Sequence, residues 1–211
     1  MKLSKKEESD ICLSCGECCR RYLITVLKEE ASLIARTLKK SNKRFLEEDT
    51  QLSVKLFAKS VDGVLTFPTT FFPKRIGQMI EENVKPVPQS FFVLPQVVLK
   101  KEHGCTFLNE DNTCKIYSAR PAPCRLFPFI AVEGIRESYP FCLLFKKTNK
   151  DYSKQSRSYF KKVKNYFAEV DKKGFTKYWK NPPKKGLLYL HDTFIGEINL
   201  KELEEMMQVK H

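Results

Sequence analysis

The sequence predicts an α+β fold: a single compact cysteine-cluster domain of short hairpins and helices, followed by a C-terminal helical appendage. Three observations carry this prediction. Some segments repeat apolar residues at helical spacing, others are short apolar runs bounded by turn residues, and all eight cysteines lie in two groups before residue 145. We therefore expect a metal-chelating domain over residues 10–145 and a lysine-rich, mainly helical extension over residues 146–211 packed on it.

Several segments carry helix or strand patterns. Helices are predicted over residues 27–39, 43–60, 76–83 and 151–173, a strand over 187–190, and a last helix opened by a capping box of Asn199 and Glu202. The aromatic stripe of residues 151–173 is interpreted as core, with Gly174 as the helix stop. We expect the proline- and phenylalanine-rich residues 66–95 to wrap the cysteine cluster.

Four cysteines near the start form a C-x2-C-x2-C-C run: Cys12, Cys15, Cys18 and Cys19. A disulfide framework is the rival explanation, but the chain is long enough for a hydrophobic core and shows no secretory signal segment. Adjacent cysteines also pair badly, because a disulfide needs Cα atoms about 4.4–6.8 Å apart and neighbours lie about 3.8 Å apart. In an extended stretch Cys18 and Cys19 would point to opposite sides, so we expect them to serve different metals, or one to ligate while the other packs or reacts.

The other four cysteines are spread more widely: Cys105, Cys114, Cys124 and Cys142. Strand patterns over residues 105–108 and 113–117, on either side of turn residues 109–112, predict a hairpin that brings Cys105 close to Cys114. Ser118 and Pro121 resemble the start of a helix whose first turns carry Cys124, and a hairpin over residues 130–138 would deliver Cys142. We expect both groups to meet in one sulfur-lined core.

The motif residues also match a known family. They are Cys12-x2-Cys15-x2-Cys18-Cys19-Arg20, then Gly104-Cys105-Thr106-Phe107-Leu108, then the run from Cys114 to Pro128 with Arg120-Pro121-Ala122-Pro123-Cys124-Arg125 inside it, and Cys142. This pattern resembles the CxxCxxCC proteins, the YkgJ-type cysteine-cluster family, over roughly residues 10–145. The resemblance implies chelation of zinc or iron. The same module is found in flagellin lysine N-methylases, which are described as iron–sulfur proteins.

The expected metal ligands are all eight thiolates, and all-thiolate donor sets suit zinc and iron–sulfur clusters. We prefer an iron–sulfur cluster over zinc because the first run is closely spaced, no histidine is placed for a mixed zinc site, and the methylases resemble this chain. The adjacent pair Cys18 and Cys19 departs from ferredoxin spacing and would suit two neighbouring zinc sites instead. His103, two residues before Cys105, is interpreted as a donor to a ligating sulfur or a plain surface residue.

Arginines flank the thiols. Four thiolates on zinc, or on a cluster core of charge +2, leave a net charge of −2 that nearby cations must offset. Arg20, Arg120 and Arg125 are the expected residues, with ordinary surface charge as the alternative for Arg20. A role for Arg120 and Arg125 in binding an anionic substrate carboxylate stays open.

The formal net charge is +13, and many of the lysines lie between Lys146 and Lys185. This balance allows an acidic protein or a nucleic acid as partner, although a solvated lysine-rich surface is the preferred explanation. No apolar run reaches the ~18 residues that span a bilayer, so we expect a cytoplasmic protein with no membrane span. Phosphate-binding loops, zincin motifs, nucleophile elbows and dinucleotide glycine motifs are absent, so no catalytic residue is predicted.

Three functional hypotheses follow. The first is a cytosolic metal-binding protein whose cluster is structural, or stores or relays metal. The second is an iron–sulfur enzyme acting in protein lysine methylation or redox chemistry. The third is a basic module with structural zinc that binds nucleic acid or an acidic partner. Whether any reaction is catalysed stays open.

Overall fold

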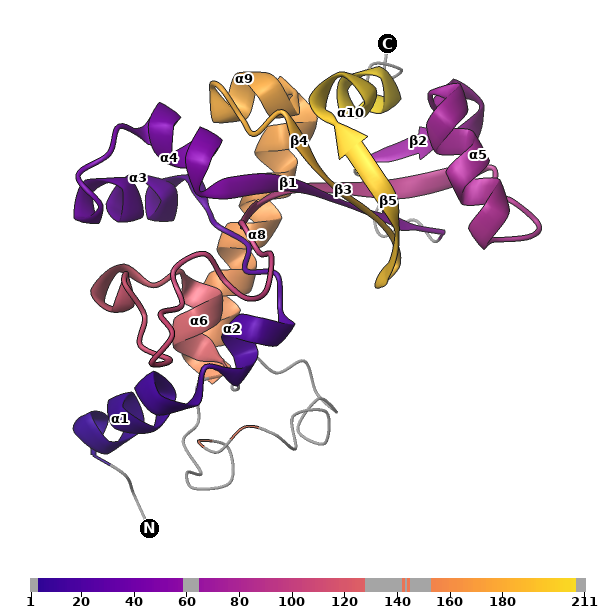
Figure 1. Cartoon of the computed structure of the whole chain (residues 1–211). Helices are drawn as coiled ribbons and strands as arrows, with labels where there is room; N and C mark the ends of the chain where they lie inside the picture. The colour runs from indigo at the N-terminus through magenta and orange to yellow at the C-terminus, as the bar shows by residue number, and fades with distance from the viewer. Residues whose placement is uncertain (1–3, 59–64, 128–141, 143, 145–152, 208–211) are drawn as a thin grey trace. The chain divides into compact units, whose positions relative to one another are not determined.

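The computed structural model describes residues 4–58, 65–127, 142, 144 and 153–207 (Figure 1). The fold is α+β, as predicted. Contacts divide the chain into two compact units, each made of two segments: unit 1 is Met1–Lys40 with Leu99–Val163, and unit 2 is Ser41–Val98 with Lys164–His211. The predicted boundary near residue 145 falls inside the second segment of unit 1.

Unit 1 is helical in its regular structure. Its elements are α1 (Lys5–Cys15), α2 (Glu17–Arg21), α3 (Lys28–Thr37), the 3₁₀ turn η2 (Tyr117–Ala119), α6 (Ala122–Leu126) and the first part of α8 (Ser153–Lys173). α3 and α8 confirm the predicted helices over 27–39 and, in its described part, 151–173. No helix in the described ranges is long and apolar enough to cross a bilayer.

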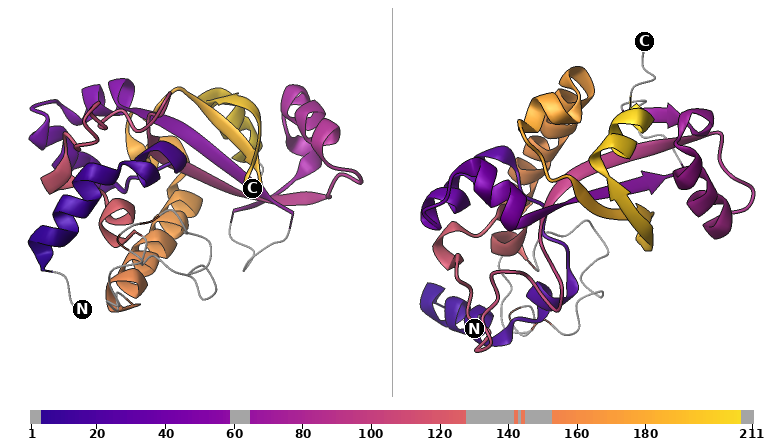
Figure 2. Two further views of the ribbon diagram at one scale, coloured as in Figure 1. Left: turned by 60° about the horizontal axis from the view of Figure 1, so that its bottom comes forward. Right: turned by 45° about the horizontal axis from the view of Figure 1, so that its top comes forward.

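Unit 2 is built on a five-stranded mixed sheet of order β2-β3-β1-β4-β5. The strands are β1 (Thr50–Phe57), β2 (Thr66–Pro68), β3 (Ser90–Leu99), β4 (Lys185–Leu190) and β5 (Thr193–Asn199). The other elements are α4 (Asn42–Glu48), η1 (Thr69–Phe71), α5 (Lys74–Asn83), α9 (Phe175–Trp179) and α10 (Leu200–Met207). β1 and β4 pair in parallel, while β2 with β3 and β4 with β5 pair antiparallel; the β4–β5 hairpin and the long strands β1 and β3 are visible in Figure 2.

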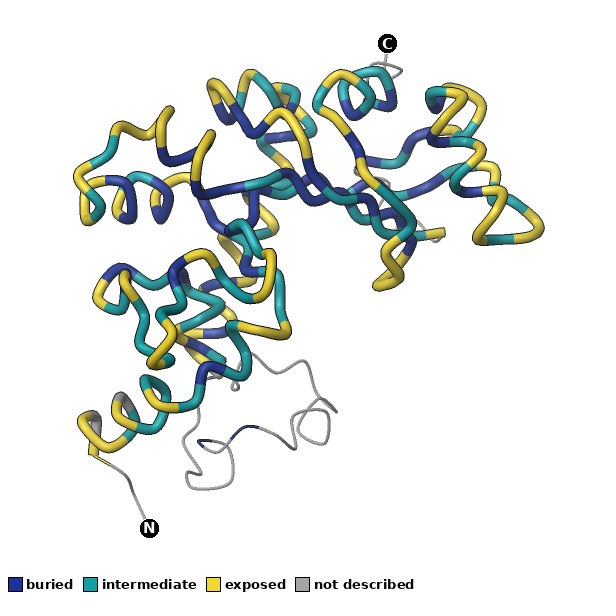
Figure 3. The backbone as a smooth tube through the Cα atoms, viewed as in Figure 1, coloured by how far each residue is buried: buried dark blue, intermediate teal, exposed yellow. Residues whose placement is uncertain are grey.

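The core of unit 2 lies on the central strands, where buried positions alternate with half-buried ones (Figure 3). Leu52, Val54 and Leu56 of β1 are fully buried, as are Phe91 and Val93 of β3. This two-residue period explains why the helix predicted over residues 43–60 is wrong in its second half. α4 ends at Glu48, and pairing of the following residues with β4, a strand distant in sequence, stabilises an extended chain.

Other predicted elements of unit 2 are confirmed. α5 covers the helix predicted over 76–83, and β4 covers the strand predicted over 187–190. The capping box forms as expected, because Asn199 N donates to Glu202 Oε2 at 2.9 Å and Glu202 N donates to Asn199 Oδ1 at 3.0 Å. The aromatic stripe of α8 is core at Tyr166 and Val170, whereas Phe160 is exposed.

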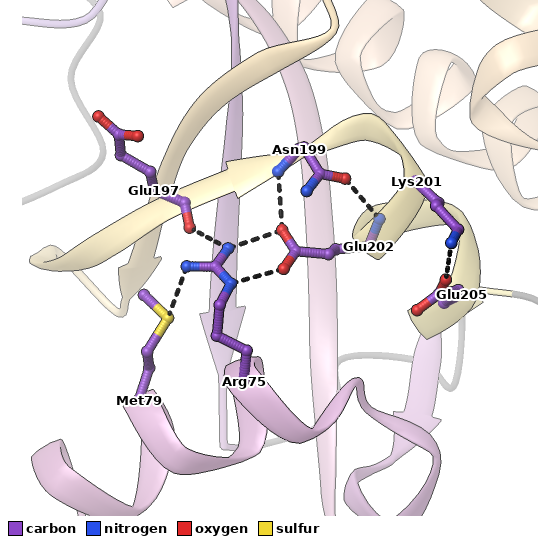
Figure 4. A network of polar contacts seen from close by, with 7 residues as sticks. All are labelled: Arg75, Met79, Glu197, Asn199, Lys201, Glu202 and Glu205. Atoms are coloured by element: carbon purple, nitrogen blue, oxygen red, sulfur yellow. Dashed lines mark hydrogen bonds and ion pairs between the residues drawn. The ribbon is translucent and has the colours of Figure 1, made fainter.

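Arg75 fastens α5 to β5 and α10 (Figure 4). Its guanidinium donates through Nε to Glu202 Oε1 at 2.6 Å and through Nη2 to Glu202 Oε2 at 2.7 Å, and also to Glu197 O at 2.8 Å. The hydrogen bonds from Arg75 lower the pKa of Glu202. Since the Glu202 side chain is only 13% exposed, this two-pronged pair is screened by water less than an ordinary surface pair.

Gly186 is required by the parallel pairing of β1 with β4. It lies opposite Leu52, and a Cβ at this position would stand 1.8 Å from Leu52 O and 2.3 Å from Leu52 C. Because backbone atoms cannot move aside cheaply, we expect Gly186→Ala to destabilise the protein by about 1–3 kcal/mol. Chemical denaturation followed by circular dichroism measures this change.

Gly77→Ala is the matched control. Gly77 lies inside α5, where an added Cβ meets no atom within 4 Å. The control should stabilise the protein by about 0.5–1 kcal/mol, since alanine favours a helix interior over glycine. Equal unfolding curves for Gly186→Ala and the parent would show that this strand pairing is wrong.

Candidate metal centre

All eight cysteines line one cavity of about 60 Å³ in unit 1. They are Cys12, Cys15, Cys18, Cys19, Cys105, Cys114, Cys124 and Cys142. Every one is a free thiol, and Cys142 is buried while the others are half-buried. The structure therefore brings the two predicted groups together. The wall comes from residues 11–24 and 99–144 of unit 1. Residues 66–95, which were expected to wrap the cluster, belong to unit 2, so that expectation stays a prediction.

The N-terminal run is a pair of short helices joined by a sharp turn. α1 begins with a capping box of Ser4 and Glu7 and ends at Cys15, and α2 starts two residues later. Gly16 makes the turn with φ of +64°, a left-handed conformation that favours glycine. Cys12 and Cys15 are three residues apart on α1 and so share a face.

Cys18 and Cys19 lie in α2, so the extended stretch considered for them is wrong. Neighbouring residues on a helix differ by about 100° in direction rather than pointing to opposite sides. Both side chains therefore reach the same cavity. The Cys18 thiol donates a hydrogen bond to the Cys19 sulfur, which raises the pKa of Cys18 and lowers the pKa of Cys19.

Arg20 and Asn112 hold the turn in place. Arg20 Nη1 donates to Cys15 O at 3.3 Å, and its Nη2 donates to Asn112 Oδ1. Asn112 Nδ2 in turn donates to Ser14 O at 3.3 Å. The Arg20 side chain crosses so close to Gly16 that an added Cβ there would lie 2.7 Å from Nη1. Sequence reasoning recognised Asn112 only as a turn residue and missed this role.

The second group reaches the first through the backbone. Cys105 N donates to Cys19 O at 2.9 Å, which joins the two groups directly. Leu108 and Cys114 form an isolated antiparallel bridge, so the chain returns as the predicted hairpin would. The strands predicted over 105–108 and 113–117 are wrong, however, because only isolated bridges form and η2 begins at Tyr117.

Cys124 lies in α6, as predicted. The buried side chain of Glu30 on α3 positions this helix: Oε1 accepts from Ala122 N at 2.6 Å, while Oε2 accepts from Leu27 N at 2.9 Å. Sequence reasoning missed Glu30. Its signal was a carboxylate on the apolar face of α3, three residues after Leu27 and one before Ala31.

Cys142 packs with Leu144 in a small buried cluster against Ile11, Cys12 and Phe127. This contact places Cys142 beside the first cysteine of the N-terminal run. The hairpin predicted over residues 130–138, which would deliver Cys142, lies outside the described residues.

Arg120 is the cation of the cavity wall. Its guanidinium carbon lies 3.6 Å from the centre of the Tyr117 ring, and its Nε donates to Tyr117 O at 3.2 Å. Burial raises the pKa of Cys12, Cys114 and Cys124, and the charge of Arg120 opposes each rise. The charge-balancing role of Arg120 at a metal stays a prediction.

Burial also raises the pKa of Cys105 to about 11. Buried thiols of this kind hold their protons at neutral pH, so metal binding must displace protons.

The other predicted residues lie around the cavity or away from it. The charge of Arg20 contributes to the lowered pKa of Cys19, after the hydrogen bond from Cys18 and the charge of Arg120. Arg125 does not line the sulfur-lined cavity. Its Nη1 donates a hydrogen bond to Arg120 O at 2.6 Å and so helps to position Arg120. His103 is exposed and outside the wall.

In the part of the chain that the structure describes, no three histidine, cysteine or carboxylate side chains converge on one point as metal ligands do. All eight cysteines nevertheless line one cavity, where Cys18 donates a hydrogen bond to Cys19 and Arg120 donates one to Cys12.

Comparison with known proteins bears on this site. No curated protein and no solved structure matches the chain. The family model named CxxCxxCC, described as a "putative zinc- or iron-chelating domain", matches residues 11–152. This range is more than half of the 211 residues and contains all eight cysteines. With its cysteines gathered on one cavity, the chain belongs to the CxxCxxCC family of zinc- or iron-chelating domains.

Proposed function

We propose that the chain binds zinc or iron through two groups of four thiolates that share α2. The observation that carries this proposal is the gathering of eight free thiols from two distant segments on one cavity. Zinc and iron–sulfur clusters are metal centres that a protein can hold through thiolate ligands alone. When bound, such a centre contributes folding free energy and, in the case of an iron–sulfur cluster, one-electron chemistry.

The first proposed group is Cys12, Cys15, Cys18 and Cys142. Cys12 and Cys15 share a face of α1, and Cys12 packs against Cys142. Burial has the largest effect on the pKa of Cys12 and raises it, and the charge of Arg120 opposes this rise. Among the other thiols, Cys142 and Cys15 raise this pKa through their charges.

The second proposed group is Cys19, Cys105, Cys114 and Cys124. Besides burial, the charge of Cys19 raises the pKa of each of the other three thiols. The backbone bond from Cys105 to Cys19 supports the same set. Cys18 and Cys19, which are neighbours on α2, then stand at the junction of the two groups.

Our preference within this proposal is iron–sulfur. The C-x2-C-x2-C spacing is that of ferredoxin runs. No histidine lines the cavity among the described residues, so the mixed nitrogen and sulfur sites common for zinc gain no support. Arg120, which contacts the Tyr117 ring and lines the cavity, supports either metal because its charge would offset the negative charge that thiolate ligation leaves.

Single substitutions test the two groups. We expect Cys15→Ser to remove about half of the bound metal and Cys124→Ser to remove the other half, each with a large fall in melting temperature, because structural metal contributes on the order of 10 kcal/mol in small zinc domains. Metal per chain and thermal unfolding are the measurements. The double substitution Lys184→Ala with Lys185→Ala, at exposed positions in unit 2, is the control and should change neither.

Two results would contradict this proposal. Loss of all metal from either cysteine variant would show one shared centre rather than two groups. If Cys15→Ser keeps its metal and its melting temperature, Cys15 does not hold a structural metal.

Metal analysis of protein purified without oxygen distinguishes an iron–sulfur cluster from zinc. Because oxygen destroys thiolate-bound iron clusters but leaves zinc, aerobic preparations mislead. We expect brown protein that contains iron and acid-labile sulfide in comparable amounts. Colourless protein with about two zinc ions per chain and no sulfide, as four-thiolate zinc sites predict, would overturn the iron–sulfur preference and leave the two groups in place.

A further inference from the structure

A second cavity of unit 1 lies outside the cysteine centre. Its volume is about 630 Å³, within the range of about 300–1,000 Å³ that small-molecule sites occupy. Helices α3, α6 and the first part of α8 supply the wall. No cysteine belongs to it, although α6 contributes Cys124 to the sulfur-lined cavity and Arg125 to this one.

The wall combines an apolar part with charged groups. Tyr159 and Leu126 are buried and Leu33 is partly exposed, so an apolar body of a ligand would find apolar partners. Three cations and two carboxylates complete the set of charges: Arg125, Lys154 and Lys162, with Glu29 and Glu30. The net charge of the side chains that line this cavity is therefore +1.

The two carboxylates are already engaged. Glu29 pairs with Lys162 at 3.3 Å. Glu30 accepts two backbone N–H groups and lies 4.0 Å from Arg125 Nη2. Lys154 is left without an ion pair among the described residues, and it is exposed at the cavity wall. Arg125 is half exposed and keeps N–H donors beyond those used by Arg120 O and Glu30.

We propose that this cavity binds a small organic carboxylate, with the carboxylate at Lys154 and Arg125 and an apolar body against Tyr159, Leu126 and Leu33. One unmatched positive charge suits a monoanion better than a phosphate dianion. The planar fork of arginine matches a carboxylate, and the buried ring and leucine supply the apolar contact. The site needs no metal, so it stands apart from the function proposed for the cysteines.

Three probes of similar shape test the chemistry on the full chain: phenylacetate, phenyl phosphate and benzyl alcohol. Ligand-observed NMR titration gives each dissociation constant. We expect saturable binding of phenylacetate and at least about tenfold weaker binding of benzyl alcohol, since a hydrogen bond to a charged group is worth that factor. Equal binding of benzyl alcohol and phenylacetate would show that the cavity does not recognise an anion. Tighter binding of phenyl phosphate would show that the preferred ligand is a phosphate and not a carboxylate. No saturable binding of any probe would show that the cavity is not a binding site.

Variants test the location. Lys154→Gln should weaken phenylacetate binding about tenfold by the same reasoning. Lys161→Gln is the matched control, because Lys161 is exposed on the same helix and does not line the cavity. Ser158→Trp fills the cavity without changing its charge and should abolish binding. Equal weakening by both lysine variants would indicate general attraction to a basic surface, and unchanged binding in Ser158→Trp would place the probe elsewhere, so either result overturns the proposal.

Discussion

The left-handed turn at Gly16 is the constraint on which the cysteine centre depends. Along an unbroken helix, Cys12 and Cys19 would be about 10 Å apart at a rise of 1.5 Å per residue. The turn ends α1 directly after Cys15 and starts α2 directly before Cys18, so the two pairs of thiols bend around one cavity. Arg20 then ties this bend to Asn112. A local backbone conformation thus decides whether four neighbouring thiols reach the same cavity.

Low polarity around the thiols shapes what the cavity does chemically. Burial favours the protonated thiol at Cys12, Cys105 and Cys124, and Arg120 only moderates this effect where it is close. The same burial strengthens attraction between thiolates and a cation that enters. The site is therefore one in which metal and protons compete, with Arg120 stabilised by the face of Tyr117 as the fixed positive charge.

Sequence patterns were sufficient where the determining contacts are local. The capping box at Asn199, the apolar face of α3 and the proline before α6 all act within a few residues, and each predicted its helix. β1 was misjudged because Leu52 and Leu56 also stand at helical spacing, and the pairing with β4 that stabilises the strand lies far along the chain.

The candidate site followed the same rule. The cysteines were identifiable from their spacing, but how they meet depends on the hydrogen bond from Cys105 to Cys19, which spacing does not encode. The supporting residues Asn112 and Glu30 were missed for a related reason. An asparagine in a turn and a glutamate in a helix are common, and only their partners across the unit give them a role.

The interleaving of two segments in each unit has a consequence for synthesis. Cys12 to Cys19 leave the ribosome early, whereas the chain that completes unit 1 ends at Val163. At ~5–20 residues per second the N-terminal thiols wait on the order of 10 s for their partners. During that interval residues of the other unit are made first, and the early thiols stand exposed to oxidants and to competing metals.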